Sequence, residues 1–427
     1  MRKDIGRRNL FQLAFIHKPR YVALVIAAGS PFLFGGSCGE EITTEPTVVV
    51  TWQRTFGGGL EDRGEAVARV NGGYAAAGWS ISFGPGAADF YLVKVNDSGR
   101  ALWQEQYGGA ADDLSRALVV ADDGGLVMAG VTSSFGAGGT DMYLVKADAN
   151  GQFLWDTTFG GAFDEEAFAI LKTSDGGFLI TGSSVTIGGG ALKAGYVVKT
   201  DANGSFQWDT GGQLTIFANE IIGYDAIETP DGGYLIVGET IPQAPNWSQV
   251  YLAKLDSSGT LLWQTSHGGQ VDDRGKSVVV APDGDFVIVG STTSFGAVGW
   301  DIYAMRVSAS GDTVRWQKNY GGSMDDHGER GIATSDGGFV IIGTKDFGSG
   351  AVEPGQPEPT GRQMYLMKID GSGAMLWDRT YGGLEFESGR QALIAADGGY
   401  VLIGVTMSAG AGRQDMFLLK TNSDGGI

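Results

Sequence analysis

The chain has 427 residues, among them 72 Gly, 21 Phe, 14 Tyr and 10 Trp, and its formal net charge is −19. Because nucleic acid binding needs a basic face, this charge argues against nucleic acid as a partner, and it also argues against adhesion to anionic lipid headgroups. The many Gly and aromatic residues suit short strands joined by tight turns.

The amino terminus has the pattern of an export signal. The first 20 residues are basic, and Tyr21 to Phe34 form an apolar run that is too short to span a bilayer comfortably. The run leads into Gly35-Gly36-Ser37-Cys38, which resembles the lipobox of bacterial lipoproteins, although Gly35 stands where a leucine-like residue is usual. This resemblance implies a signal peptide over residues 1–37 and a lipid on Cys38. Ordinary signal cleavage and a retained anchor are the alternatives.

The segment after the signal is short and polar. Residues 38–47 contain Glu40, Glu41, Glu45 and Pro46 and are predicted to be a tether. Cys38 is the single cysteine, so the mature chain has no disulfide, which is compatible with an oxidising compartment but does not require one. We expect an exported protein of the cell envelope, periplasmic or on the cell surface, or a secreted one if Cys38 is not lipidated.

From residue 48 onward the sequence is a repeat. The stretch Asp336 to Gly343 occurs in seven altered copies, and successive copies are 52 to 61 residues apart. The other copies begin at Asn71, Asp123, Asp175, Asp231, Asp283 and Asp397. A period of about 50 residues with strand-like content is typical of a β-propeller. We therefore predict an all-β, seven-bladed β-propeller of four-stranded antiparallel blades over residues 48–427, and we expect a monomer.

The first repeat shows how a blade is built. Alternating or continuous apolar residues predict four strands. These strands are expected at residues 65–70, 74–78, 90–95 and 101–107. The last repeat has no fourth strand after its third at Phe417, whereas an unpaired strand is predicted at residues 48–57. The amino-terminal strand should therefore complete the last blade, which removes the open sheet edges.

These repeats resemble the β-propeller repeats of secreted and surface bacterial proteins. The shared features are the Asp-Gly-Gly turn, Ser-Phe-Gly, Tyr-Leu-x-Lys and the tryptophan of the fourth strand. The resemblance covers residues 48–427 and implies the fold, but it says almost nothing about activity.

Two groups of tryptophans can be distinguished. Those in the register of the fourth strand are predicted to pack between neighbouring blades, namely Trp155, Trp208, Trp263, Trp316 and Trp377. Trp79, Trp247 and Trp300 fall outside that register, near loops, and are candidates for stacking on a ligand such as a sugar, with local loop packing as the alternative. The loops 241–249 and 351–362 are the most irregular.

An acidic pair opens most repeats. Its clearest members are Asp112, Asp113, Asp272, Asp273, Asp325 and Asp326. Together with Asp89, Asp141, Asp301 and Asp415, which are placed before the third strands, they could form a ring of carboxylates around one mouth of the channel. Such a ring could hold Ca²⁺ or a cationic partner. The alternative is that each acid accepts backbone N–H groups of the turn between blades.

Other polar motifs give weaker signals. The turns beginning at Asp148, Asp201, Asp256 and Asp370 slightly resemble Ca²⁺ loops but fit ordinary turn chemistry better. His267 stands where other repeats have Phe or Tyr, so it should substitute for them in packing. His327 lies beside Asp325-Asp326 and is a candidate ligand-binding residue that can titrate.

No catalytic constellation is evident, and no cofactor is implied beyond Ca²⁺. We expect a non-catalytic binding or scaffold module for a protein or polysaccharide of the cell envelope, which contacts the membrane only through a lipid at Cys38. The alternatives are a glycosidase-like enzyme that uses carboxylates of the loop-rich face and a Ca²⁺-dependent binding propeller.

Overall fold

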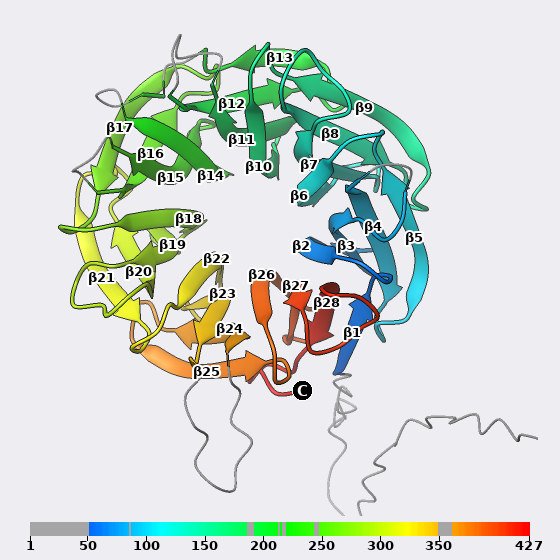
Figure 1. The fold of residues 1–427 in the computed structure, drawn as a ribbon. Coiled ribbons are helices and arrows are strands. Elements are labelled where there is room, and N and C mark those ends of the chain that lie inside the picture. Colours follow the sequence, from blue (N-terminus) through cyan, green and yellow to red (C-terminus); the bar gives the residue numbers. More distant parts are fainter. Residues whose placement is uncertain are drawn as a thin grey trace, which may run out of the picture. The chain divides into compact units, whose positions relative to one another are not determined.

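The computed structural model describes residues 51–84, 87–185, 192–211, 214–215, 219–242, 247–348 and 361–427. Within these residues, 28 strands form seven four-stranded antiparallel sheets around a central axis (Figure 1). The predicted seven-bladed β-propeller is confirmed. Outside the described residues lie the predicted signal peptide, Cys38, the predicted tether, residues 243–246 of the loop 241–249 and residues 351–360 of the blade-six loop. Among the described residues, no helix is long and apolar enough to cross a membrane.

The first four blades follow the chain from the channel outward. Blade one consists of β2 (Asp62–Val70), β3 (Gly73–Ser80), β4 (Asp89–Asn96) and β5 (Ala101–Tyr107). Blade two consists of β6 (Asp113–Val120), β7 (Leu126–Thr132), β8 (Asp141–Ala147) and β9 (Phe153–Phe159). Blade three consists of β10 (Glu165–Lys172), β11 (Phe178–Ser184), β12 (Ala194–Thr200) and β13 (Phe206–Asp209). Blade four consists of β14 (Glu220–Glu228), β15 (Tyr234–Ile241), β16 (Gln249–Leu255) and β17 (Leu261–His267).

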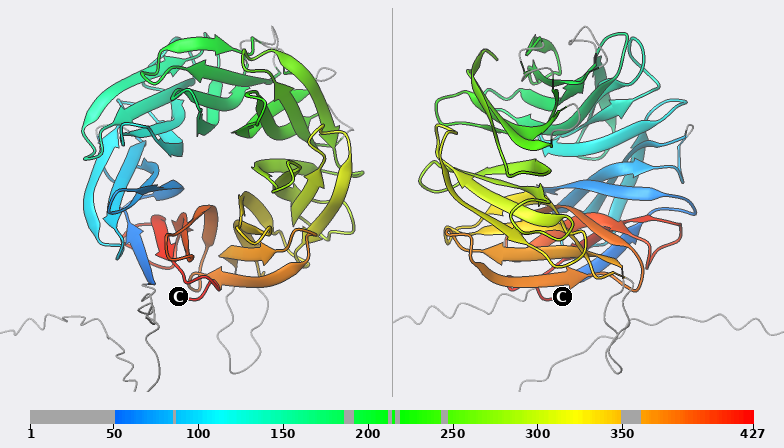
Figure 2. Two further views of the ribbon diagram at one scale, coloured as in Figure 1. Left: turned by 180° about the vertical axis from the view of Figure 1, so that it is seen from behind. Right: turned by 60° about the vertical axis from the view of Figure 1, so that its left-hand side comes forward.

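The last three blades complete the ring. Blade five consists of β18 (Asp273–Val280), β19 (Phe286–Thr292), β20 (Asp301–Val307) and β21 (Val314–Tyr320). Blade six consists of β22 (His327–Ala333), β23 (Phe339–Asp346), β24 (Arg362–Ile369) and β25 (Met375–Tyr381). Blade seven consists of β26 (Glu387–Ile394), β27 (Tyr400–Thr406), β28 (Asp415–Lys420) and β1 (Trp52–Phe56). Figure 2 shows from two further sides that the inner strands surround the channel and the fourth strands lie at the periphery.

The amino-terminal strand closes the ring. β1 pairs antiparallel with β28, so that Trp52 faces Lys420 and Phe56 faces Met416. The prediction that an amino-terminal strand completes the last blade is confirmed. The carboxyl-terminal residues 422–426 form the same tight turn that links the third and fourth strands elsewhere, with the Gly425 N–H donating to the Asn422 carbonyl at 3.2 Å.

The inner strands begin earlier than the sequence indicated. β2 begins at Asp62 and pairs Asp62 with Ser80, whereas a strand was expected from residue 65. The acids of the repeat were expected before the strands, but Asp62, Asp113, Glu165, Asp273 and Glu387 are first residues of inner strands. Their backbones continue the sheet ladder, while their side chains accept N–H groups of the loop that enters from the preceding blade, as Asp113 does from Gly109.

The tryptophans of the fourth strands pack between blades, as predicted. Each indole lies against a glycine in the turn between the third and fourth strands of the following blade. At Gly99, which has φ +76°, a Cβ atom would lie 2.5 Å from the Trp52 ring, and at Gly204 it would lie 2.6 Å from the Trp155 ring. The close approach and the positive φ both require glycine there.

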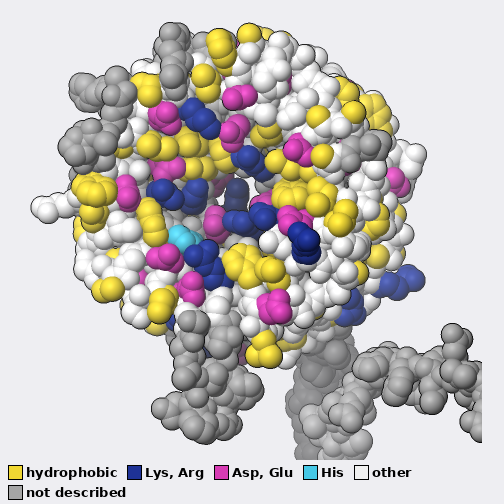
Figure 3. All heavy atoms as spheres, viewed as in Figure 1, with side chains coloured by type: hydrophobic (Ala, Val, Ile, Leu, Met, Phe, Trp, Pro, Cys, Tyr) yellow, Lys and Arg dark blue, Asp and Glu magenta, His cyan; other side chains and the backbone are white. Residues whose placement is uncertain are grey.

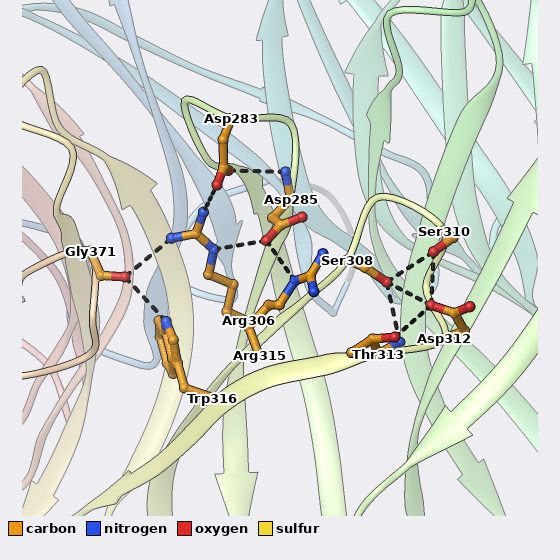
Figure 4. A network of polar contacts seen from close by, with 10 residues as sticks. All are labelled: Asp283, Asp285, Arg306, Ser308, Ser310, Asp312, Thr313, Arg315, Trp316 and Gly371. Atoms are coloured by element: carbon orange, nitrogen blue, oxygen red, sulfur yellow. Dashed lines mark hydrogen bonds and ion pairs between the residues drawn. The ribbon is translucent and has the colours of Figure 1, made fainter.

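In most blades, a basic residue of the third strand forms ion pairs with the turn that joins the first and second strands. In blade five, Arg306 at the end of β20 bonds to Asp283 and Asp285 of the turn before β19, and to the carbonyl of Gly371 in the next blade (Figure 4). Lysines take the place of Arg306 in five other blades, for example Lys254 with Asp231 at 3.0 Å. The Asp-Gly-Gly turns and the basic residue of the third strand therefore serve the fold.

Candidate functional site: the central channel

One residue of each inner strand bulges into the channel. In all seven blades, the pairing between the first and second strands shifts by one residue at the same place. The skipped residues, called the bulge ring here, are Glu65, Arg116, Phe168, Tyr224, Lys276, Glu329 and Arg390. All seven line a single cavity of about 410 Å³. A bulge re-aims a side chain out of the regular alternation, and here it directs one side chain per blade toward the axis.

One half of the bulge ring is aromatic and flanked by cations. The rings of Phe168 and Tyr224 meet edge to face at a centroid distance of 5.0 Å. The Arg116 guanidinium lies 4.3 Å from the Phe168 centroid, and the Lys276 ammonium lies 3.2 Å from the Tyr224 centroid. Both are cation–π contacts, so these four side chains form one continuous row.

The other half of the ring is an ion-pair row. Arg390 lies between Glu65 at 3.5 Å and Glu329 at 3.3 Å. Burial raises the pKa of Glu65, although Arg390 opposes this shift. The charge of Glu65 raises the pKa of Arg390. The one guanidinium of this row is therefore shared by two carboxyl groups, so the row contributes no unpaired cation to the channel.

The basic residues of the aromatic half differ in how well they are compensated. Arg116 pairs with Glu166 at 3.1 Å, and Lys193 also pairs with Glu166 at 2.9 Å. Burial alone would raise the pKa of Glu166, but Lys193 and Arg116 outweigh it and the pKa is lowered. Lys276 has no ion pair among the described residues. Burial lowers its pKa, because a desolvated ammonium is disfavoured.

Three of the candidates from the sequence contact side chains of the inner strands or belong to such a strand. Trp79 lines the cavity and lies beneath the Arg63 guanidinium at 5.1 Å. Trp300 lies beneath Arg274 at 4.4 Å and 6.0 Å from the His327 ring. Burial lowers the pKa of His327. Figure 3 shows basic and acidic side chains gathered around the central hollow on this face. Trp247 is elsewhere, on the loop before β16, and is 51% exposed.

The carboxylates of the predicted acidic ring point into the junctions between blades. Asp113, Asp273 and Asp326 are fully or almost fully buried and accept backbone N–H groups of Gly109, Gly269 and Gly322. Hydroxyl groups add to this at Asp273, where Ser294 donates at 3.0 Å. The sequence analysis gave such hydrogen bonds as the alternative to a ring that holds Ca²⁺ or a cationic partner. They account for the recurrence of the acid in six of seven blades. Ile221 takes this position in β14.

The first acid of each pair holds the preceding loop. Asp112 accepts the Ala88 N–H at 3.1 Å, Asp272 accepts the Ser248 N–H at 2.8 Å, and Asp325 accepts the Trp300 N–H at 3.1 Å. Among the described residues, no group of three or more His, Cys, Asp or Glu side chains is placed to hold a metal ion. The six aspartates therefore have a structural role in this geometry, and Ca²⁺ binding by them stays a prediction.

The remaining polar candidates fit turn chemistry and packing. Asp256 accepts the N–H groups of Ser258 and Thr260, as expected for an ordinary turn. His267 Nε2 lies 2.8 Å from the Gly311 carbonyl oxygen, where Tyr381 in another blade donates to Gly425 at 2.7 Å. His267 thus replaces a tyrosine in both packing and hydrogen bonding.

The bulge ring is the site that the sequence did not reveal. A signal was present, because the position three residues after the second acid changes from blade to blade, whereas the residue before it is Gly, Ser or Ala in every repeat. Glu65, Arg116, Phe168, Lys276, Glu329 and Arg390 all stand at this position, and Tyr224 stands three residues after Ile221. Only the strand register shows that this position faces the channel.

No protein-family model matches the chain, and no curated protein matches it. Solved structures share its fold at low sequence identity. The polysaccharide lyase Uly1 superposes with a TM-score of 0.52 at 12% identity, covering 86% of this chain and 92% of that one. A variant of puromycin hydrolase superposes with a TM-score of 0.52 at 13% identity, covering 86% of this chain and 53% of that one. These two proteins differ in activity, so the likeness concerns the fold alone.

Proposed function

We propose that this protein is a non-catalytic binding module that takes a protein or polysaccharide of the cell envelope at the mouth of its central channel. The supporting observation is the variety of the bulge ring, where seven equivalent positions carry five residue types. A position that served only the fold of the blade would carry the same kind of residue in each repeat. The acids at the junctions between blades, such as Asp113 and Asp273 (the junction acids), do so. A ligand without sevenfold symmetry favours different residues around the ring.

The proposed setting is the envelope of a bacterium. Residues 1–37 direct export, and a lipid on Cys38 tethers the propeller, which acts as a monomer and does not bind nucleic acid. The test is cell fractionation of the full chain and a Cys38→Ala variant. We expect the parent in the membrane fraction and the variant in the soluble exported fraction. A variant that stays with the membrane would overturn the lipid tether and leave the binding proposal to its own test.

The binding proposal is tested by capture from an envelope extract. The channel double variant carries Arg116→Gln and Lys276→Met. These changes leave no new unpaired carboxylate, because Glu166 keeps Lys193 and Lys276 has no ion pair among the described residues. The control, the outer-strand double variant, carries Arg315→Gln and Lys318→Met on β21, where Asp285 keeps Arg306.

We expect the parent and the outer-strand double variant to retain the same protein or polysaccharide. The channel double variant should lose it. Equal retention by all three proteins would place binding elsewhere, for instance at Trp247, and would contradict the channel site.

A carbohydrate-active enzyme is the second candidate, because two carboxylates face the same cavity. Glu65 and Glu329 both line it and both contact Arg390. The raised pKa of Glu65 is a property of general acids in glycoside hydrolysis. New reducing ends released from an envelope polysaccharide by the parent, and abolished by Glu65→Gln or Glu329→Gln, would establish the enzyme. Intact polysaccharide after prolonged incubation would exclude it for that substrate.

A further inference from the structure

The channel is basic although the protein is strongly acidic. The cavity is lined by five basic side chains, Arg63, Arg116, Lys276, Arg330 and Arg390, and by two carboxylates, Glu65 and Glu329. The formal charge of the chain as a whole is −19. Arg116, Arg330 and Arg390 are paired with carboxylates, whereas Arg63 and Lys276 have no ion pair within the part of the chain that the structure describes. The local excess of cations therefore comes from Arg63 and Lys276, and it attracts an anion to the channel.

Lys276 is the cation with the least compensation. Its nearest described partner is the face of Tyr224, and the Tyr224 hydroxyl donates to Glu239 at 2.6 Å. Glu239 is in turn paired with Arg274 at 2.8 Å. Glu329, whose charge also acts on Lys276, is paired with Arg390 at 3.3 Å. Both carboxylates that act on Lys276 are thus paired with another cation. An anion bound beside Lys276 would supply the missing counter-charge and recover part of the cost of burying the ammonium.

The cavity also offers an apolar surface between its cations. Phe168 and Tyr224 form an aromatic wall, with Arg116 over the Phe168 ring and Lys276 over the Tyr224 ring, and Trp79 adds a third aromatic ring to the cavity lining. Binding sites combine such aromatic area with a few placed polar groups. A ligand that matches this wall has a ring with an apolar face and negative groups at its edge.

We infer that the bulge ring binds an anionic sugar, with the sugar ring against Phe168 and Tyr224 and its carboxylate or sulfate groups on Arg116 and Lys276. The inference rests on the proposed channel site and names its ligand class. A cavity of about 410 Å³ has the size of a small-molecule site, so it accommodates a short oligosaccharide or one end of a chain. The acidic outer surface disfavours a polyanion lying along the propeller.

The experiment is isothermal titration of the full-length protein in detergent with defined oligosaccharides of equal length. The probes are an oligogalacturonate, its methyl ester, a sulfated oligosaccharide and a neutral maltooligosaccharide. We expect saturable binding of an anionic oligosaccharide that weakens as ionic strength rises. The methyl ester and the neutral sugar should bind at least tenfold more weakly. Comparison of the carboxylated and sulfated probes identifies which anionic group is preferred.

The variants locate the site. Lys276→Met and Arg116→Gln should each weaken binding about tenfold or more, whereas Arg315→Gln and Lys318→Met should leave it unchanged. A neutral sugar that binds as tightly as the charged one would overturn the inference, as would full affinity in Lys276→Met. If no anionic sugar binds but capture from the extract still depends on the channel double variant, the ligand class is wrong and the site stands. If capture is also independent of these residues, both proposals fail.

Discussion

The closing strand provides the most direct test of the fold. Trp52 of β1 is 5% exposed, packs against Tyr74 at a centroid distance of 6.3 Å and donates its Nε1–H to the Asp97 carbonyl at 2.9 Å. Trp52 joins blade seven to blade one, and blade seven combines β1 with β26, β27 and β28. Replacing a buried tryptophan by alanine costs about 3–5 kcal/mol. That is a large part of the 5–15 kcal/mol typical of a folded protein.

The assay is urea unfolding of Trp52→Ala, with Trp103→Ala as the matched control. Trp103 has the same place in β5 and contacts Gly151 as Trp52 contacts Gly99, but it is only half-buried. We expect Trp52→Ala to lose about 3–5 kcal/mol of unfolding free energy and Trp103→Ala less. In addition, limited proteolysis should cut near residues 48–57 in Trp52→Ala but not in Trp103→Ala.

Removal of residues 48–57 is the stronger form of the same test. We expect this deletion to abolish cooperative unfolding, because β28 loses all five of its paired residues on that side. Attaching the same segment after Gly426 should restore folding, since residues 422–426 already form the turn that precedes a fourth strand. A deletion variant that melts cooperatively at the parent temperature would refute the role of β1 in closure.

Three further outcomes are expected. Burial raises the pKa of Asp326 to about 6, so the folded state binds this proton more tightly than the unfolded state. The melting temperature should therefore fall as pH rises from about 4 to about 6, and Asp326→Asn should flatten that slope. An unchanged slope in the variant would show that other groups control it. Chelator should leave the melting temperature unchanged, because Asp113, Asp273 and Asp326 already accept backbone N–H groups; a clear drop would make Ca²⁺ part of the fold. Tyr381→Phe should lower the free energy of unfolding in urea by about 1 kcal/mol, because the Gly425 carbonyl loses its hydrogen-bond donor. His267→Phe should lower it by a similar amount, because the Gly311 carbonyl loses its contact with the His267 ring. A change near zero in both variants would mean that water replaces these donors.

The repeat made the fold predictable from the sequence. The number of blades, the closing strand and the packing of the fourth-strand tryptophans all follow from a pattern that occurs seven times. The sequence also suggested that the junction acids accept backbone N–H groups of the turns between blades. A residue that recurs in almost every blade is best explained by an interaction that every blade needs. His267 could be placed by the same reasoning, since its register equals that of Tyr381.

The channel site could not be predicted in the same way. A bulge depends on the pairing of two strands, and no single residue type marks it, because Glu65, Phe168 and Lys276 share a position without sharing chemistry. The net charge pointed away from anions, since an average over 427 residues hides a few cations gathered at one axis. Trp79 and Trp300 lie outside the fourth strands, and their contacts with Arg63 and Arg274 depend on the blade geometry, which the sequence does not show.

The bulge has a consequence for how such a protein can diversify. A bulged residue has no partner opposite it in the ladder, so its replacement leaves the pairing of the inner strand intact. Glu65, Arg116 and Lys276 can therefore be exchanged with little effect on the pairing of the sheet. Gly64 cannot, because a Cβ atom there would lie 2.6 Å from Ile403. Asp113 cannot either, because its carboxylate accepts the Gly109 N–H. Relatives with the same scaffold could acquire new ligands through seven positions alone. A library randomised at Arg116, Phe168, Tyr224 and Lys276, with the ion pairs of Arg390 retained, would keep the propeller while sampling a new channel in each member.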